Sequence, residues 1–208
     1  MMAHKAARFM LSVLLGLILL TFLGGPICAQ LDANITPGTL KWRFSRWGFY
    51  PPALGVDGSV YYASESCLFC LNPATGTVNW ARSLGYHVVS MPVIARDGTI
   101  FVTVKDNLGN AHVYLCSLDP AGNVNWKRPY DLHWYSQPAL GADGSVYIFG
   151  NTGTGSGLYA IDPVDGSIQW IFQDIHDQTP RESPVIGRDG TVYVGMSNEG
   201  IDLSLIHI

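Results

Sequence analysis

The stretch Pro138-Ala-Leu-Gly-Ala-Asp143-Gly144-Ser-Val-Tyr147 decides the fold, because the chain of 208 residues contains four copies of its pattern. Each copy begins with a proline, has Asp-Gly five residues later and continues with β-branched and aromatic residues. The other three copies are Pro52-Ala-Leu-Gly-Val-Asp57-Gly58-Ser-Val-Tyr61, Pro92-Val-Ile-Ala-Arg-Asp97-Gly98-Thr-Ile-Phe101 and Pro184-Val-Ile-Gly-Arg-Asp189-Gly190-Thr-Val-Tyr193. The Asp-Gly steps are 40, 46 and 46 residues apart, a spacing typical of structural repeats that stack on one another.

Two further blocks recur with the same period. After each of the first three copies, an apolar run ends in Asn-Pro or Asp-Pro, which places Asn72, Asp119 and Asp162 at the start of a turn. A Gly-x-x-x-Trp block occurs at Gly38 and Trp42, Gly76 and Trp80, Gly122 and Trp126, and Gly166 and Trp170. We interpret these tryptophans as structural: each fills the space between neighbouring sheets and donates its indole N–H to a backbone acceptor.

Each repeat is expected to form four short antiparallel strands. The proline suits the first position of a strand, where its missing N–H does no harm. Asp-Gly between two apolar runs predicts a hairpin with a type I′ turn, which requires positive φ at both central residues. The predicted hairpin residues are Asp57, Gly58, Asp97, Gly98, Asp143, Gly144, Asp189 and Gly190.

Sheets of this kind have two apolar faces, which they bury by stacking on neighbouring sheets around an axis. The sequence therefore predicts an all-β fold, a β-propeller with four-stranded antiparallel blades. We expect an incomplete arc of about 3.5 to 4 blades at this repeat length. A four-bladed ring that the strand of Trp42 closes is the alternative.

The residues around the tryptophans resemble the repeat of the pyrroloquinoline quinone (PQQ), or quinoprotein-like, β-propellers. That family has the docking motif Ala-x-Asp-x-x-Thr-Gly-x-x-x-Trp, and two segments are similar to it. They are Cys70-Leu-Asn72-Pro-Ala-Thr75-Gly76-Thr-Val-Asn-Trp80 and Ala160-Ile-Asp162-Pro-Val-Asp165-Gly166-Ser-Ile-Gln-Trp170. The copy from Ser117 to Trp126 is one residue shorter, so its turn is expected to be tighter. The family contains alcohol dehydrogenases that use PQQ and calcium, and also non-catalytic envelope proteins such as the propeller of the outer-membrane β-barrel assembly machinery.

The resemblance to the dehydrogenases does not extend to the residues that would hold their cofactor. It implies a disulfide between adjacent cysteines, a Glu/Asn/Asp calcium set and a catalytic aspartate. Cys67 and Cys70 are two residues apart, and turns explain most of the carboxylates. We therefore expect no catalytic, cofactor-binding or metal-binding residues and no cofactor. PQQ and calcium belong to the alternative, in which the chain is the N-terminal part of a PQQ-dependent quinoprotein dehydrogenase.

Residues 1–29 are predicted to be a cleaved signal peptide. Lys5 and Arg8 precede an uncharged run from Phe9 to Leu23, which is shorter than the ~20 residues that span a bilayer. An uncleaved anchor and a lipoprotein acylated at Cys28 are the alternatives. After cleavage no transmembrane span is expected, so the mature protein is predicted to be secreted, periplasmic or at the cell surface.

The propeller repeats are expected to occupy residues 30–202. The last residues, Leu203-Ser-Leu-Ile-His-Ile208, fit no block of the repeat. Because they match the translation of a sequencing-adapter end, we interpret 203–208 as a non-native read-through tail.

The composition excludes several classes of protein. A chain with 48% hydrophobic residues is not disordered. It has 12 Lys and Arg against 16 Asp and Glu and no basic cluster, so nucleic acid is excluded as a partner.

A binding surface is expected in the connections from each tryptophan to the next proline, because loops carry most binding residues. Aromatic and histidine side chains gather there, at Trp47, Tyr50, Tyr86, His87, His133, Trp134, Tyr135 and His176. A ring of these histidines around a metal is a second interpretation, but equivalent positions on neighbouring blades are expected to lie too far apart. The sequence thus predicts an exported, non-catalytic propeller that acts as a binding or scaffold module in the cell envelope or outside the cell, with a protein or glycan partner.

Overall fold

The computed structural model describes residues 38–106, 112–132, 134–151, 156–174, 179–180, 183–198 and 200–206. The predicted signal peptide, residues 1–29, lies outside these ranges. All regular structure in them is β-strand, which confirms the predicted all-β class. Within the same ranges no helix has the length and apolarity needed to cross a membrane. The chain divides into the units Met1–Leu40 and Lys41–Ile208, and all the strands belong to the second.

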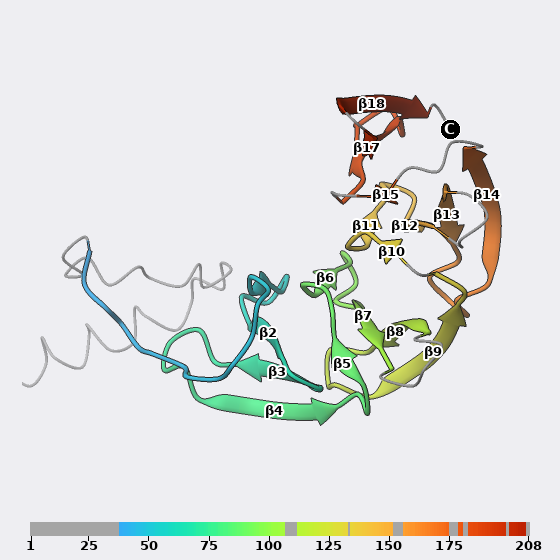
Figure 1. Cartoon of the computed structure of the whole chain (residues 1–208). Helices are drawn as coiled ribbons and strands as arrows, with labels where there is room; N and C mark the ends of the chain where they lie inside the picture. The colour runs from blue at the N-terminus through green and yellow to red at the C-terminus, as the bar shows by residue number, and fades with distance from the viewer. Residues whose placement is uncertain are drawn as a thin grey trace, which may run out of the picture. The chain divides into compact units, whose positions relative to one another are not determined.

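Four antiparallel sheets follow one another along the chain, one for each Asp-Gly copy (Figure 1). The first contains β1 (Ala53–Leu54), β2 (Val60–Ser64), β3 (Cys67–Leu71) and β4 (Val78–Ser83). The second contains β5 (His87–Val88), β6 (Val93–Ile94), β7 (Ile100–Lys105), β8 (Val113–Leu118) and β9 (Val124–Tyr130). The third contains β10 (Trp134–Tyr135), β11 (Ala139–Leu140), β12 (Val146–Asn151), β13 (Ser156–Ile161) and β14 (Ile168–Asp174). The fourth contains β15 (Thr179–Pro180), β16 (Val185–Ile186), β17 (Val192–Asn198) and β18 (Gly200–Ile206).

The first strand of the second sheet is interrupted, so β5 and β6 pair with the same edge of β7. At the interruption the hydroxyl of Ser90 accepts a hydrogen bond of 2.8 Å from the backbone N–H of Thr103. Ser136 does the same for the N–H of Phe149 in the third sheet, at 3.0 Å. A buried serine oxygen thus replaces the backbone acceptor that a continuous strand would supply.

The Asp-Gly hairpins form, but their turn is not the predicted type I′. Gly58 has a φ of 82°, whereas Glu65 is the sole non-glycine residue with positive φ in the described ranges, so Asp57 lacks it. The N–H of Gly58 bonds to the carbonyl of Gly55, and the N–H of Gly55 bonds to the carbonyl of Ser59. This is a type I turn followed by a left-handed glycine. Asp97-Gly98, Asp143-Gly144 and Asp189-Gly190 share this geometry.

The core consists of three clusters of buried side chains, one between each pair of successive sheets. Strand β7 contributes to two of them: Val102 packs with residues of the first sheet, and Phe101 packs with residues of the third. Both side chains are fully buried. Alternate residues of a strand point to opposite faces, so a strand that is buried on both sides is apolar throughout.

Trp80 in β4 and Trp126 in β9 join the first sheet to the second and the second to the third, and Trp42, which precedes β1, bonds to the turn after β3. The indole N–H groups of Trp42, Trp80 and Trp126 donate to the carbonyls of Pro73, Pro120 and Pro163, at 2.9, 3.0 and 3.0 Å. The ring of each tryptophan lies on the glycine of the same turn. A Cβ atom on Gly76, Gly122 or Gly166 would lie 2.6 to 2.8 Å from the ring of Trp42, Trp80 or Trp126.

The remaining predicted docking residues also have defined places. Asn72, Asp119 and Asp162 accept N–H groups of their own turns at 2.8 Å. The turn after Asp119 closes on Asn123, one residue earlier than the turns after Asn72 and Asp162, so it is tighter, as its length predicts. Trp170 packs against the third cluster, with its ring 5.8 Å from that of Tyr147. Gly38 has a φ of 85°, and a Cβ atom at this position would meet no atom within 4 Å.

The fourth sheet contains a strand that the sequence did not predict. β18 pairs with β17 from Asn198 opposite Gly200 to Val192 opposite Ile206, so residues 203–206 are part of the sheet. These residues match no block of the repeat in sequence, but ladder hydrogen bonds use the backbone and need no particular side chains, so they pair as a strand. The non-native origin of 203–208 stays a prediction.

Candidate functional site

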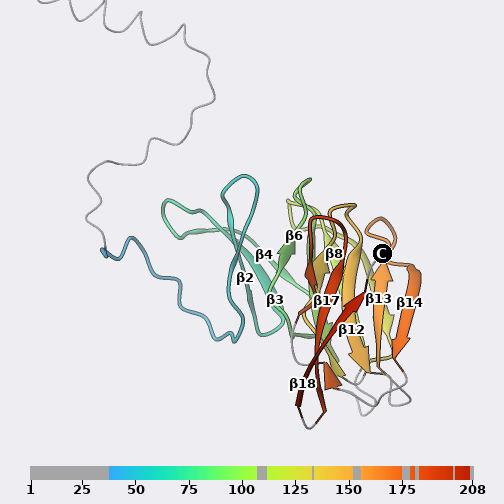
Figure 2. The same ribbon diagram turned by 90° about the horizontal axis from the view of Figure 1, so that it is seen from above.

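Two kinds of turn lie at one end of each of the first three sheets, and the fourth sheet has one of them. In a four-stranded antiparallel sheet the first and third turns lie at the same end, and the second turn lies at the other. The first turns are the Asp-Gly turns, residues 55–59, 95–99, 141–145 and 187–191, and the third are the docking turns, residues 72–77, 119–123 and 162–167. We call this end the turn end, and we call the opposite end, where the connections to the next sheet lie, the link end (Figure 2).

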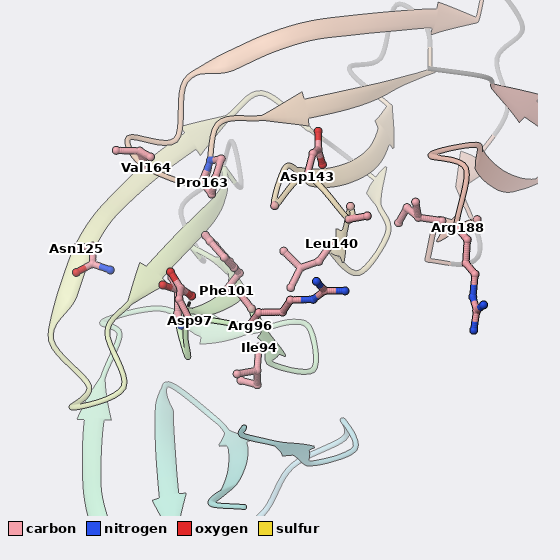
Figure 3. Close-up of a pocket in the computed structure, with 17 residues that line it drawn as sticks. Ile94, Arg96, Asp97, Phe101, Asn125, Leu140, Asp143, Pro163, Val164 and Arg188 are labelled. Atoms are coloured by element: carbon pink, nitrogen blue, oxygen red, sulfur yellow. Dashed lines mark hydrogen bonds between the residues drawn. The ribbon is translucent and has the colours of Figure 1, made fainter. Parts of the chain in front are cut away.

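A cavity of about 760 Å³ lies at the turn end, bordered by the Asp-Gly turns of the second, third and fourth sheets (Figure 3). This volume is within the range of small-ligand sites. Its apolar lining includes Ile94, Phe101, Leu140, Pro163, Val164 and Ile186. Its polar lining includes Arg96, Asp97, Asn125, Asp143 and Arg188.

The apolar lining is continuous with the core. Phe101 belongs to the cluster between the second and third sheets, where it is 0% exposed. Ile94, Leu140 and Ile186 are half-buried and pack against the first, second and third clusters. Side chains that the core holds in this way do not rearrange freely, so the cavity is preformed.

The carboxylates of the lining accept hydrogen bonds from their own turns. Asp97 accepts the N–H of Thr99 at 2.9 Å, and this hydrogen bond lowers the pKa of Asp97 below its usual value. Asp143 accepts the N–H of Ser145 at 3.1 Å and the hydroxyl of Ser145 at 2.9 Å. Asp97 therefore stabilises its turn as an anion.

The two arginines of the lining have no such hydrogen bonds in the described residues. Arg96 and Arg188 are exposed and occupy the same repeat position, directly before Asp97 and Asp189. Neither guanidinium has a hydrogen bond or ion pair in the described part of the chain. The open hydrogen-bonding groups of the cavity are thus cationic donors.

The residues predicted to form a binding surface lie elsewhere. His87 lies in β5, and Trp134 and Tyr135 form β10, so these three are in strands and not in loops. The reason is that strand pairing begins before the proline of each repeat, where the sequence predicts a loop. His87 lies opposite Lys105, and Trp134 lies opposite Asn151. Their role in binding stays a prediction.

Of the other predicted binding residues, Trp47 is 79% exposed and its carbonyl accepts the hydroxyl of Ser64. Tyr50 is half-buried, and its burial raises its pKa. Both precede the first strand β1, at the link end. His133 and His176 lie outside the described residues, so the proposed histidine ring cannot be placed.

Tyr86 takes part in a stack that the sequence did not predict. Its ring lies 5.0 Å from that of Tyr114, and the Nζ atom of Lys127 lies 3.7 Å from the centroid of the Tyr86 ring. Lys127 also donates to the carbonyl of Leu84 at 3.0 Å. Such a cation–π contact stabilises the connection in which Tyr86 lies.

The expected absence of PQQ and calcium stays a prediction. Within the described ranges no group of three His, Cys, Asp or Glu side chains could hold a metal ion. Cys67, Cys70 and Cys116 are free thiols, and burial raises the pKa of Cys116 to about 12, which makes it unreactive.

Sequence reasoning missed the cavity and its lining residues. The one signal is the residue before each Asp-Gly, which is Val56, Arg96, Ala142 and Arg188 in the four copies. The charge at this position differs between the four copies, whereas the Asp-Gly that follows it is the same in all four. Such variation inside a constant turn is compatible with a surface that contacts a ligand.

Comparison with known proteins supports the architecture. The family model described as outer membrane protein assembly factor BamB matches residues 29–200. No curated protein sequence matches the chain. Among solved structures the chain is similar to BamB from Moraxella catarrhalis, with a TM-score of 0.53 and 19% identity over 71% of this chain and 46% of that chain.

Two other solved structures have the same fold. A quinohemoprotein alcohol dehydrogenase from Pseudomonas putida HK5 has a TM-score of 0.58 and 16% identity, over 76% of this chain and 29% of that chain. A protein of unknown function from Bacteroides caccae has a TM-score of 0.51 and 15% identity, over 75% of this chain and 59% of that chain. The chain thus spans between 29% and 59% of the length of these three structures.

The matched range 29–200 includes all four Asp-Gly copies and all four docking tryptophans. With each interrupted inner strand counted once, the first three sheets are the four-stranded antiparallel blades that the repeat predicts, and the fourth contains three strands in the described residues. The chain therefore belongs to the PQQ-repeat β-propeller family that the outer membrane protein assembly factor BamB represents.

Proposed function

We propose that this chain is an exported, non-catalytic propeller that binds a protein partner in the cell envelope. The match of residues 29–200 to the family of an outer membrane protein assembly factor carries the proposal. A propeller in such an assembly role needs surfaces that bind other proteins.

The chemistry of the cavity supports a binding role. Its carboxylates Asp97 and Asp143 accept hydrogen bonds within their own turns. Its apolar lining and its two unpaired guanidinium groups are features of a recognition site.

Export is tested by the mature N-terminus. The chain, expressed in a Gram-negative host and released by osmotic shock, is expected to begin at Gln30 when its mass is measured. In the variant Leu14→Arg, Leu15→Arg the charged residues interrupt the apolar run, so this variant is expected to stay in the cytoplasm. A wild-type chain that stays in the cytoplasm with its N-terminal segment intact would refute export.

Partner binding is tested by photo-cross-linking in intact cells of the source organism. A benzophenone amino acid replaces Val164 at the turn end, where the side chain is 82% exposed, or Trp47 at the link end. The matched control replaces Phe172 in the outer strand β14, which is 44% exposed. An adduct with one envelope protein from either end, and none from Phe172, is expected. Equal labelling from all three positions, or no adduct from either end, argues against a binding module.

A further inference from the structure

We infer that the cavity at the turn end binds an extended peptide in which acidic residues flank an apolar centre. The inference rests on the proposed function as a protein-binding module and names the chemistry of the partner segment. Three features of the cavity carry it: its apolar floor, its open donors and the distance between those donors.

The floor requires an apolar group in the ligand. Phe101 is fully buried beneath it, and Ile94, Leu140 and Ile186 present their half-buried side chains from three successive sheets. Contact with these side chains removes apolar surface of the ligand from water, which favours binding.

The open donors require hydrogen-bond acceptors. The lining holds Arg96 and Arg188 as well as Asp97 and Asp143, so its net charge selects neither sign. The guanidinium groups have no partner in the described ranges, whereas the carboxylates, which keep their charge, already accept hydrogen bonds from their own turns, so a ligand acceptor would satisfy the groups that lack one. In Figure 3 the side chain of Arg96 extends from its turn toward Leu140. A guanidinium beside an apolar surface pairs best with a carboxylate, which can accept two parallel hydrogen bonds.

The distance between the arginines favours a peptide over a small carboxylate. Arg96 belongs to the second sheet and Arg188 to the fourth, so one sheet lies between them. Sheets pack ~10 Å apart, which places the two turns on the order of 20 Å apart. An extended chain covers ~3.4 Å per residue, so about six residues reach both arginines. A small carboxylate reaches one of them.

The test is fluorescence anisotropy with the full chain and a labelled peptide, Glu-Ala-Leu-Phe-Ala-Glu-amide. The peptide with lysine in place of both glutamates controls for charge, and unlabelled octanoate, added as a competitor, represents a small carboxylate. We expect the glutamate peptide to bind, the lysine peptide not to bind, and octanoate to compete poorly.

Variants locate the site. Arg96→Gln and Arg188→Gln are each expected to weaken binding of the glutamate peptide about 5-fold, and the double variant about 25-fold, as for exposed ion pairs. Leu140→Glu is expected to abolish binding, because its carboxylate replaces the apolar centre of the floor and repels the peptide. Arg43→Gln removes an exposed charge away from the cavity and serves as the matched control, with no expected change. Urea midpoints like that of the wild type show that the variants fold.

Three results would overturn the inference: equal binding of the lysine peptide, affinity unchanged in the double arginine variant, or octanoate competing as well as unlabelled peptide. None of these touches the proposed function, which the cross-linking from Val164 and Trp47 tests separately. Cross-links from Trp47 alone, together with no peptide binding, would leave the binding module standing and remove this site.

Discussion

The indole N–H of Trp80 donates a hydrogen bond of 3.0 Å to the carbonyl of Pro120, which lies 40 residues away in the next sheet. Arg82, two residues after Trp80, donates from Nε to the carbonyl of Gly122 at 2.6 Å. Trp126 and Arg128 repeat both contacts on the turn of the third sheet. Strands β4 and β9 are thus each fixed to the docking turn of the following sheet, which holds the first three sheets against one another.

Replacing Trp80 separates the hydrogen bond from the packing of the ring. Trp80→Phe keeps an aromatic ring and removes the N–H, so it is expected to lower the free energy of unfolding by about 1 to 2 kcal/mol. Trp80→Ala also leaves a void between the sheets and is expected to cost about 3 to 5 kcal/mol. Urea denaturation followed by circular dichroism measures both. Equal losses in the two variants would show that the ring contributes nothing.

Gly122 is required for two reasons, which a matched pair of variants separates. Gly58 and Gly122 have φ values of 82° and 83°, so alanine is strained at both positions. A Cβ on Gly122 would also lie 2.8 Å from the ring of Trp80, whereas a Cβ on Gly58 meets no atom within 4 Å. Gly58→Ala is therefore expected to cost about 1 kcal/mol, the usual penalty for a left-handed alanine. Gly122→Ala is expected to cost at least twice as much in the same denaturation assay, and similar costs would contradict the docking of Trp80 on this turn.

The interruption of the inner strand predicts opposite effects for two neighbouring hydroxyl groups. Ser90→Ala leaves the buried N–H of Thr103 without its acceptor and is expected to cost about 1 to 3 kcal/mol. The hydroxyl of Thr103 itself is buried and has no partner among the residues that the structure describes, so Thr103→Val is expected to be neutral or stabilising. Thermal unfolding of the two variants gives the comparison. A Thr103→Val protein as unstable as Ser90→Ala would mean that this hydroxyl has an acceptor.

The aspartates of the hairpin turns predict a loss of stability in acid. Hydrogen bonds from the N–H groups of Ser59 and Thr99 lower the pKa values of Asp57 and Asp97. A lowered folded-state pKa means that the carboxylates stabilise the fold above the unfolded-state pKa of about 3.9, and that this stabilisation is lost as the pH falls through the lower folded-state value. The urea midpoint is therefore expected to be level from about pH 7 to 5 and to fall below about pH 4.

The double variant Asp57→Asn, Asp97→Asn is the control for this prediction. Its amide oxygens still accept the turn hydrogen bonds, but they do not titrate. The fall in urea midpoint below about pH 4 is expected to be shallower in this variant than in the wild type. If both fall equally, other carboxylates cause the acid sensitivity.

The blades were predictable because the determinants of each one are local and recur. Trp80, Gly76 and Asn72 lie within nine residues of one another, and the same block returns in each repeat, so one interpretation accounts for several docking turns. The turn type was not predictable. A type I turn with a left-handed glycine and a type I′ turn both place Gly58 at a positive φ, and they differ in the conformation of Asp57, which the residue type leaves open.

The cavity could not be predicted because no single repeat contains it. Arg96 and Arg188 are 92 residues apart in sequence, and Leu140 lies between them on a different sheet. They line one cavity because the tryptophans hold successive sheets at a fixed spacing. That spacing is a property of packing between repeats, which the spacing of motifs along the chain does not reveal.

The central claim, that this propeller binds and does not catalyse, is tested most directly by a dye-reduction assay. The purified chain is incubated with PQQ and Ca²⁺, and reduction of a phenazine-linked dye is followed with ethanol or glucose as substrate. The account predicts a rate equal to that of PQQ and Ca²⁺ without protein. Substrate-dependent, saturable dye reduction that requires the protein, PQQ and Ca²⁺ together would contradict it and would identify the chain as part of a quinoprotein dehydrogenase.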